Sequence, residues 1–214
     1  MLLLLENLTL RGATVCLRPL READAASLFA AASEARDSYG FTPTPDSLAA
    51  AEAYIARARR MQAAGQRFAF AIEWQGRVVG STSYANFQPW DWAGHAAQQR
   101  SDRPDAVEIG YTWLAASAQR TRCNSEAKYL LLCQAFEAWQ VHRVFLKTDA
   151  RNQRSRAAIE RLGAHFDGIL RNDMPAVDGT ARSSAYYSLL PEEWPAVKAN
   201  LEAKLAANLE AGRA

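Results

Sequence analysis

The feature that most limits the fold of this chain is a strand followed by a helix, which occurs twice in its second half. The run Val107–Leu114 is rich in apolar and aromatic residues, and apolar side chains then recur at helical spacing through Asn124–Trp139. A second strand, Arg143–Thr148, precedes a helix expected from Asn152 to Leu162. Strands that alternate with helices are typical of α/β proteins, so we expect an α/β fold.

Hairpins are predicted on both sides of this region. Arg67–Trp74 and Arg77–Asn86 are apolar runs joined by Gln75-Gly76, which indicates a tight antiparallel turn. A final hairpin, Ala164–Arg171 with Ala181–Leu190, is expected around Asp178-Gly179. The sheet should therefore contain antiparallel pairs.

The two ends of the chain add further elements. A short strand or hairpin is expected around Arg11-Gly12-Ala13, followed by a helix that Asp24 caps. A second helix is predicted over Ser47–Ala64, and Pro191–Ala211 has the pattern of a polar amphipathic helix. No linker or internal repeat marks a boundary, so we expect a single domain over residues 1–214.

Composition limits the partners. The chain is 49% apolar and has a formal net charge of +2 without a basic tract, which disfavours nucleic acid or a membrane as partner. Its three cysteines lack C-x-x-C spacing and its three histidines lie far apart, so no metal site is expected. Met1–Leu5 is too short for a signal peptide or a membrane span. We expect a cytoplasmic protein that acts on a small molecule or peptide.

A candidate anion site lies between Leu114 and the helix that begins near Asn124. The first N–H groups of a helix have no partner within the helix and attract anions. Arg120 and Arg122 lie there although cations oppose the helix dipole at this end, and an anionic ligand would explain them. A solvated loop before an ordinary capped helix explains the same residues. The G-K-[ST] of a nucleotide P-loop is absent.

The second strand-and-helix unit contains the run Lys147–Ala164, KTDARNQRSRAAIERLGA. With Val107–Leu114 and Gln119–Leu132, it resembles the GNAT superfamily of acetyl-CoA-dependent N-acetyltransferases, specifically the RimJ/RimL-type branch related to ribosomal-protein N-terminal acetyltransferases. The resemblance extends from Leu10 to about Leu201. It implies a mostly antiparallel central sheet of about six to seven strands, splayed at the cofactor site and flanked by about four to five helices.

In this family the loop after the fourth strand, with the pattern Q/R-x-x-G-x-G/A, wraps the pyrophosphate of coenzyme A with its backbone amides. Arg122 and Asn124 stand at the two glycine positions, so charge from Arg120 and Arg122 is expected to supplement the amides. The resemblance implies that acetyl-CoA is held by Trp113, Leu114, Gln119, Arg120, Thr121, Arg122, Cys123, Asn124 and Asn152.

The resemblance also implies two catalytic residues. Ser155 matches the residue that faces the thioester sulfur, one turn after Asn152, and would protonate the leaving thiolate. Glu108 lies on the strand that lines the acetyl group and would act as base, because an ammonium with a pKa near about 10 has no free lone pair at neutral pH. A strand amide near Trp113 or Leu114 would meet the oxyanion.

Structural roles account for the same residues. Asn152 is a favoured N-cap residue, with Ser155 in the first turn, and Glu108 could be a strand-end carboxylate paired with an arginine. Cys123 is a weak candidate for a nucleophile because it has no paired histidine. Strand alternation would place Glu108 on the same face as Thr112, and Tyr111 on the opposite face.

The acceptor is expected to be a primary amine, either a protein N-terminus or a small-molecule amine. The loop 87–105, with Trp90, Trp92 and His95, and the segment Tyr39–Phe41 are expected to flank the open end of the cleft. These aromatic residues suit a substrate wall or an interface, such as that of a homodimer, equally well. The alternative function is a non-catalytic acyl-CoA-binding or protein-interaction module that keeps the GNAT fold.

Overall fold

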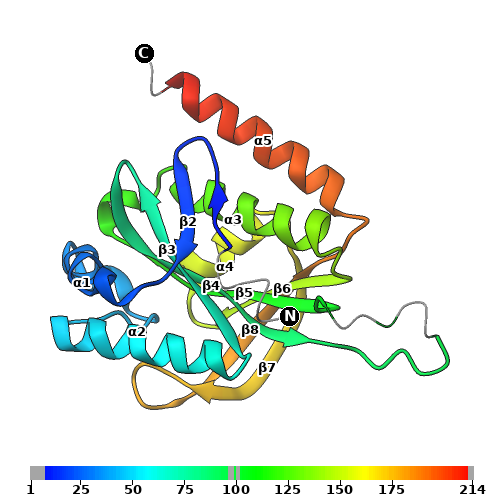
Figure 1. Cartoon of the computed structure of the whole chain (residues 1–214), viewed down its shortest axis with the longest axis horizontal. Helices are drawn as coiled ribbons and strands as arrows, with labels where there is room; N and C mark the ends of the chain where they lie inside the picture. The colour runs from blue at the N-terminus through cyan, green and yellow to red at the C-terminus, as the bar shows by residue number, and fades with distance from the viewer. Residues whose placement is uncertain (1–7, 96–98, 100–101, 212–214) are drawn as a thin grey trace.

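The central element of the computed structural model, which describes residues 8–95, 99 and 102–211, is one mixed sheet. Its eight strands have the order β1-β2-β3-β4-β5-β6-β8-β7, and the only parallel neighbours among them are β5 and β6 (Figure 1). The strands are β1 (Leu10–Arg11), β2 (Val15–Pro19), β3 (Arg67–Trp74), β4 (Arg77–Gln88), β5 (Ala106–Leu114), β6 (Arg143–Asp149), β7 (His165–Pro175) and β8 (Ala181–Leu189).

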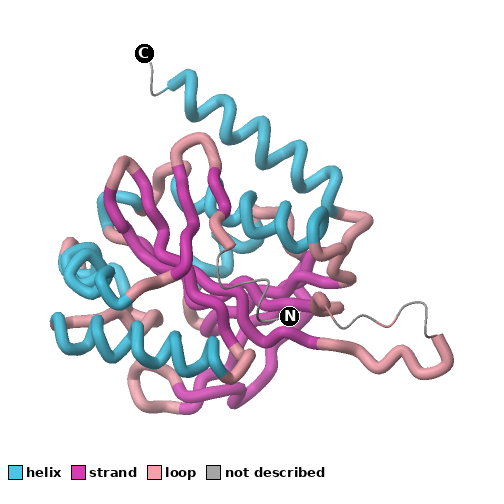
Figure 2. Tube along the Cα trace, in the orientation of Figure 1, coloured by secondary structure: helices cyan, strands magenta, loops and turns pink. Residues whose placement is uncertain are grey.

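Helices cover the sheet (Figure 2). The α-helices of the described residues are α1 (Ala25–Ser33), α2 (Leu48–Ala63), α3 (Cys123–Cys133), α4 (Gln153–Glu160) and α5 (Trp194–Ala211). α1 packs on β4 and α2 on β3, whereas α3 packs on β1, β2 and α5. The six residues Arg67–Ile72 of β3 are buried, as expected for a strand with helices on both faces.

A gap opens between β5 and β6 because the two strands pair along only part of their length. These strands pair only at their beginnings, where Ala106 lies opposite Arg143 and Glu108 opposite Phe145. Beyond this point β5 continues to Leu114 and β6 to Asp149, with no further pairing between them. The expected splay of the sheet is therefore present, and each strand keeps one unpaired backbone edge.

The helices and strands lie where the sequence predicts them, but the number of strands and some of the element bounds differ. The sheet has eight strands rather than six to seven, because the opening hairpin pairs with β3 and joins it. The helix expected from Asn124 begins at Cys123, and its last part, Gln134–Ala138, is a π-helix. The final helix begins at Trp194 rather than Pro191.

Asp24 does not cap α1 with its side chain, contrary to the expectation. Its two carboxylate oxygens accept hydrogen bonds from the Arg18 guanidinium at 2.7 and 2.8 Å, and one of them also accepts from the Arg21 N–H. The reason is tertiary: β2 brings a guanidinium to this carboxylate, and a bidentate charged pair is stronger than a cap. α2 has the expected cap, with Ser47 Oγ accepting from the Ala50 N–H.

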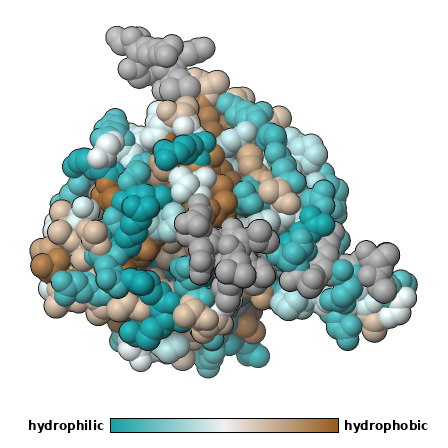
Figure 3. Space-filling view, viewed as in Figure 1, coloured by the Kyte–Doolittle hydropathy of each residue, from teal (hydrophilic) through white to brown (hydrophobic). Residues whose placement is uncertain are grey.

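On the face of the molecule drawn in Figure 3, the hydrophobic residues that are coloured appear in separate patches among hydrophilic ones. Met1–Leu5 lies outside the described residues. Among the described helices, none combines the length and apolar character that crossing a membrane requires.

Candidate active site

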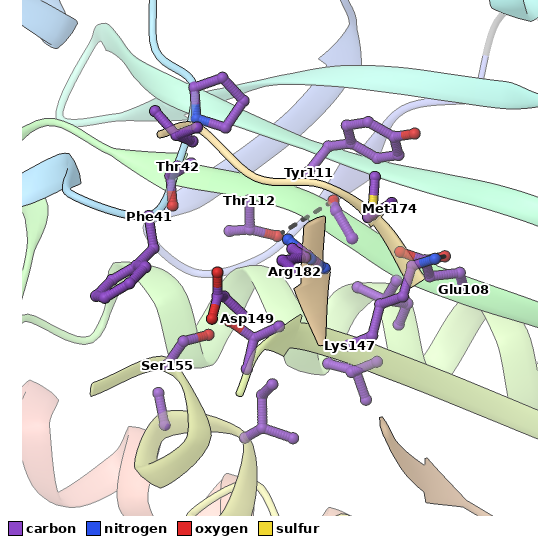
Figure 4. A pocket seen from close by; sticks show the side chains of 18 of the residues that line it. Phe41, Thr42, Glu108, Tyr111, Thr112, Lys147, Asp149, Ser155, Met174 and Arg182 are labelled. Carbon is purple, nitrogen blue, oxygen red and sulfur yellow. Dashed lines mark hydrogen bonds and ion pairs between the residues drawn. The ribbon is translucent and has the colours of Figure 1, made fainter. Parts of the chain in front are cut away.

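A cavity of about 380 Å³ occupies the gap between β5 and β6 (Figure 4). Residues 108–112 of β5 form one side of it and residues 146–149 of β6 the other. α3 contributes Asn124 and Lys128, and α4 contributes Ser155 and apolar residues. The segment 41–43, residues 174–177 at the end of β7 and just after it, and Arg182 of β8 complete the lining.

Glu108 lies in this cavity as expected, but it does not pair with an arginine. It is 3% exposed, and its Oε2 accepts a hydrogen bond from Asn86 Nδ2 and lies 3.9 Å from Lys147 Nζ. Burial raises the pKa of the Glu108 carboxyl, and the charge of Lys147 and the Asn86 hydrogen bond only partly oppose this. A buried carboxylate with a raised pKa is suited to accept a proton.

Lys147 links Glu108 to a second acid. Its Nζ lies 3.6 Å from Asp173 Oδ2 and donates to Tyr186 Oη at 3.3 Å, and Tyr186 Oη in turn donates to Asp173 Oδ1 at 3.1 Å. In Figure 4 the Lys147 side chain extends towards Glu108, whereas Ser155 lies near Asp149 at another part of the cavity.

A bulge in β5 changes which side chains share a face. Gly110 lies opposite Ser83 and Trp113 opposite Ser81, so two residues of β5 face one of β4, and Tyr111 has a φ of 53°. The Tyr111 ring lies 4.0 Å from the guanidinium of Arg67, which also bonds Tyr54 of α2.

Thr112 therefore faces α3, where Lys128 Nζ donates to its Oγ1 at 2.6 Å. The alternation expected for this strand is wrong beyond Gly110, because the extra residue of the bulge reverses it. Lys128 is 6% exposed, and burial lowers the pKa of its amino group to about 7.

Asn152 and Ser155 occupy the start of α4. Asn152 Oδ1 accepts from the Ser155 N–H at 3.0 Å, which is the N-cap role that sequence physics favours. Ser155 lines the cavity, and within the described part of the chain its Oγ has no hydrogen-bond partner; Asn152 is not among the lining residues. The cap directs the side chain of Ser155, whose hydroxyl is free to meet a ligand.

The loop before α3 is held by Thr121. Its Oγ1 donates to the Ala118 carbonyl at 2.8 Å and accepts from the Cys123 N–H at 3.1 Å. The N–H groups of Asn124 and Ser125 have no acceptor among the described residues. Arg120 is exposed and has a φ of 60°, so it takes the left-handed conformation at this loop.

The two positions that hold glycine in the family pattern do not need positive φ here. Arg122 has right-handed helical angles and Asn124 lies within α3. The Arg122 side chain turns inwards, where its Nε donates to Glu126 Oε2 at 3.2 Å. This ion pair explains one of the two arginines at the helix start without an anion.

The remaining cofactor-binding candidates lie outside the cavity lining. Gln119 Nε2 and Tyr39 Oη both donate to the Leu114 carbonyl, at 2.9 and 2.8 Å. Trp113 is buried against the rings of Tyr39 and Tyr54. Burial raises the pKa of the Cys123 thiol to about 12, which keeps it protonated and unsuited to act as a nucleophile.

Part of the expectation for the acceptor side is wrong. Trp90 and Trp92 do not line the cavity; they pack on His142, with ring centroids 5.5 and 5.2 Å from it. Asp105, which is fully buried, holds both tryptophans through the Trp90 N–H and Trp92 Nε1. These contacts hold Trp90 and Trp92 at the beginnings of β5 and β6, away from the splayed ends.

His95 is exposed and is likewise absent from the cavity lining. Phe41 does line the cavity, as expected.

Sequence reasoning missed Lys128 and Lys147. Lys128 had a recognisable signal, because it is a charged residue one helical turn after Asn124 and three residues before the buried Leu131. Lys147 had none, since a lysine near a strand end is usually solvated. Among the described residues no three side chains of the His, Cys, Asp and Glu type gather closely enough to hold a metal ion.

Known proteins resemble this chain in sequence or in fold. A 92-residue segment is 35% identical to the Bacillus subtilis (strain 168) protein named "Putative ribosomal N-acetyltransferase YdaF", and the match covers 43% of this chain and about half, 49%, of that protein. A GCN5-related N-acetyltransferase from Brucella melitensis has a TM-score of 0.76 and 28% identity over 92% of this chain and 85% of its own.

Mycobacterium smegmatis RimJ, solved in complex with CoA-disulfide, has a TM-score of 0.71 and 23% identity over 92% of this chain and 93% of its own, a likeness of fold. The family model described as "Acetyltransferase (GNAT) domain" matches residues 14–165. Because that match covers well over half of the sequence, this chain belongs to the GNAT acetyltransferase family.

Proposed function

We propose that the protein transfers an acetyl group from acetyl-CoA to a primary amine by direct attack of the amine on the thioester. The observation that carries this proposal is that Glu108 and Ser155 line one cavity, in the gap between β5 and β6. That gap supplies a base, a hydroxyl and two unpaired strand edges for one ligand.

Donor binding uses backbone groups on two elements. The free N–H groups of Asn124 and Ser125 at the start of α3 suit the pyrophosphate, and the exposed Arg120 adds a charge beside them. The unpaired edge of β5 from Ile109 to Leu114 suits the pantetheine arm and offers N–H groups to the oxyanion. Thr121, Gln119 and Cys123 shape this loop, and Arg122 is shared with Glu126.

Proton transfers fall to the two cavity residues. Glu108 takes a proton from the acceptor ammonium, because burial raises the pKa of its carboxyl towards that of the acid it must deprotonate. The C–N bond forms, the C–S bond breaks, and the departing thiolate takes a proton from the Ser155 hydroxyl, which regains one from the second N–H of the attacking nitrogen. No covalent intermediate on the enzyme is required.

The acceptor that we favour is a protein or peptide N-terminus. An α-amino group has a pKa of about 7.7–8.0, so a larger fraction is neutral at pH 7 than for a lysine side chain. The name of the YdaF relative points to ribosomal protein as a substrate class for that protein. The segments 41–43 and 174–177 border the cavity and are placed to contact the residues that follow the N-terminus.

The experiment is a thiol-release assay with acetyl-CoA. Peptides with a free N-terminus, the same peptides with a blocked N-terminus and one lysine, and small amines are compared, and product masses are recorded. We expect thiol release with the free N-terminus and an α-amino group heavier by one acetyl group. Acetyl-CoA binding without thiol release in the presence of any acceptor would favour the non-catalytic module. Turnover only with a longer acyl-CoA would mean that the donor is that thioester and not acetyl-CoA.

Ser155→Ala separates the role of the hydroxyl from that of the cap. The Asn152 cap accepts from the backbone N–H of residue 155, so the variant keeps α4 intact. We expect kcat to fall by about 10²-fold, within the usual range for a lost general acid, with little change in coenzyme A affinity. Unchanged kcat would remove Ser155 from the mechanism.

A further inference from the structure

Lys128 brings an amino group to the floor of the cavity, beside the bulge of β5. The residue lies one turn after Asn124 on α3, and both side chains line the cavity. Lys128 Nζ donates to Thr112 Oγ1 at 2.6 Å, and Thr112 Oγ1 lies 2.8 Å from Thr82 Oγ1. Thr112 therefore holds the amino group beside the bulge, on the part of β5 that no longer pairs with β6.

The amino group has no counterion. Among the described residues no carboxylate lies within ion-pair distance of Lys128, although Lys147 in the same cavity has both Glu108 and Asp173. Burial of an amine without a charged partner disfavours the folded state, and an apolar side chain of similar length would be more favourable there. A residue that costs stability at a cavity wall points to a role with a ligand.

We propose that the protonated amino group of Lys128 donates a hydrogen bond to the thioester carbonyl oxygen and stabilises its negative charge in the transition state. This inference rests on the proposed function. As the amine forms its C–N bond, the carbonyl oxygen becomes an oxyanion; when the C–S bond breaks, the oxygen returns to a carbonyl. Lys128 keeps its proton throughout, so Glu108 remains the base and Ser155 the acid.

The bulge in β5 places unpaired backbone groups beside Lys128. Tyr111 and Thr112 lie opposite a single residue of β4, and β6 has already diverged, so this part of β5 has unpaired backbone groups. A cation held at Thr112 adds a full charge to the strand amides that point into the same gap. Preorganised donors at such a point are worth about 10²–10³-fold in kcat in other enzymes.

Protonation of Lys128 makes the proposal testable by pH. Burial lowers the pKa of its amino group to about 7, and the negative charge of Glu108 opposes this shift. The other charged groups of the cavity are Lys147 and Asp149 on β6 and Arg182 on β8. The useful form of Lys128 is therefore lost as pH rises through about 7, whereas an arginine remains charged.

The test compares Lys128→Arg and Lys128→Met with wild type. Values of kcat/KM for acetyl-CoA are measured from about pH 6 to 9 at saturating acceptor, and coenzyme A affinity is measured by calorimetry. We expect the ratio of the Lys128→Arg value to the wild-type value to rise with pH through about 7, because every other titration cancels in the ratio. Lys198→Arg, which changes a surface lysine paired with Glu137, should give a flat ratio.

Lys128→Met should lower kcat by about 10²-fold while coenzyme A affinity stays within about twofold. The thermal midpoint of this variant should equal or exceed that of wild type, since a buried amine that has no counterion has been removed. An unchanged kcat in this variant, or a flat ratio for Lys128→Arg where that variant is active, would overturn the proposal. Acetylation of Lys128 itself, seen as a mass increase in the wild-type protein alone, would also overturn it and make the residue a nucleophile.

These outcomes are separable from failure of the proposed function. If wild-type protein releases no thiol with any amine, both proposals fall. If wild-type protein is active and Lys128→Met is equally active, only the role of Lys128 falls.

Discussion

Two buried glutamates, Glu126 and Glu108, differ in how the protein satisfies them. Both are almost fully buried, at 2% and 3% exposure. Glu126 accepts from four donors, which are the Thr14 N–H, Thr14 Oγ1, the Val15 N–H and Arg122 Nε. Glu108 accepts from one side-chain N–H, that of Asn86, and has Lys147 at the limit of an ion pair.

We interpret this difference as one between a structural charge, Glu126, and the proposed base, Glu108. Glu126 ties α3 to the turn before β2, and all of its donors belong to the protein. Glu108 faces a cavity with spare acceptor capacity, and burial raises the pKa of its carboxyl. Burial alone therefore does not identify a functional charge. A buried carboxylate that faces a cavity and still has unused capacity to accept hydrogen bonds is the better candidate.

The largest effect is expected for Glu108, the proposed base. Glu108→Gln should lower kcat by about 10²–10⁴-fold, because the amide cannot take the proton of the acceptor amine. Steady-state kinetics with acetyl-CoA and an N-terminal peptide would measure this. At a pH below about 4, where the Glu108 carboxyl is protonated, the free energy of unfolding should change little, and a variant that loses stability there but keeps kcat would reverse the comparison.

The structural glutamate should show the opposite pattern. Glu126→Ala leaves the Arg122 guanidinium and two backbone N–H groups buried without their acceptor, so we expect a loss of about 3–5 kcal/mol in the free energy of unfolding. Urea denaturation measures it. Under conditions where the variant is still folded, kcat should remain within a few-fold of wild type, and a selective loss of kcat would place Glu126 in the chemistry.

The pH dependence of stability sharpens the comparison. The folded-state pKa of Glu108 is raised, so the folded chain holds this proton to a higher pH than the unfolded chain. The associated stability is present below the ordinary pKa of about 4.3 and is lost as pH rises through the folded value. The unfolding free energy of Glu108→Gln minus that of wild type should therefore increase with pH over this window. A constant difference would mean that the pKa is not raised.

The smallest effect concerns the two arginines at the start of α3. Arg122 is paired with Glu126, whereas Arg120 is exposed and has no ion pair among the described residues. Arg120→Ala should weaken coenzyme A binding by about twofold to fivefold, and less at high salt. Calorimetry with coenzyme A and with pantetheine, which lacks the phosphates, measures it; equal losses for both ligands would exclude a phosphate contact.

Sequence patterns were sufficient where local and tertiary preferences agree. The hairpin of β3 and β4, the Ser47 cap and the pair Asn152 and Ser155 follow from short-range rules and are present as expected. The family resemblance added the splay of β5 and β6, which no periodicity indicates. It also brought Glu108 and Ser155 into one cavity.

The misses come from contacts between distant segments. The bulge at Tyr111 reverses the alternation of β5, and nothing in an apolar, β-rich run indicates one extra residue. Asp24 pairs with Arg18 of β2 instead of capping α1, and Trp90 packs on His142, which lies far along the chain. Such partners are set by the assembled sheet, so single-segment rules could not supply them.

A crystal structure with coenzyme A bound would test the central claim most directly, because it locates the phosphates and the sulfur together. We expect the pyrophosphate at the N–H groups of Asn124 and Ser125, the pantetheine arm along β5 beyond Glu108, and the sulfur within reach of Ser155 Oγ. Coenzyme A bound elsewhere, with the gap between β5 and β6 empty, would contradict the account.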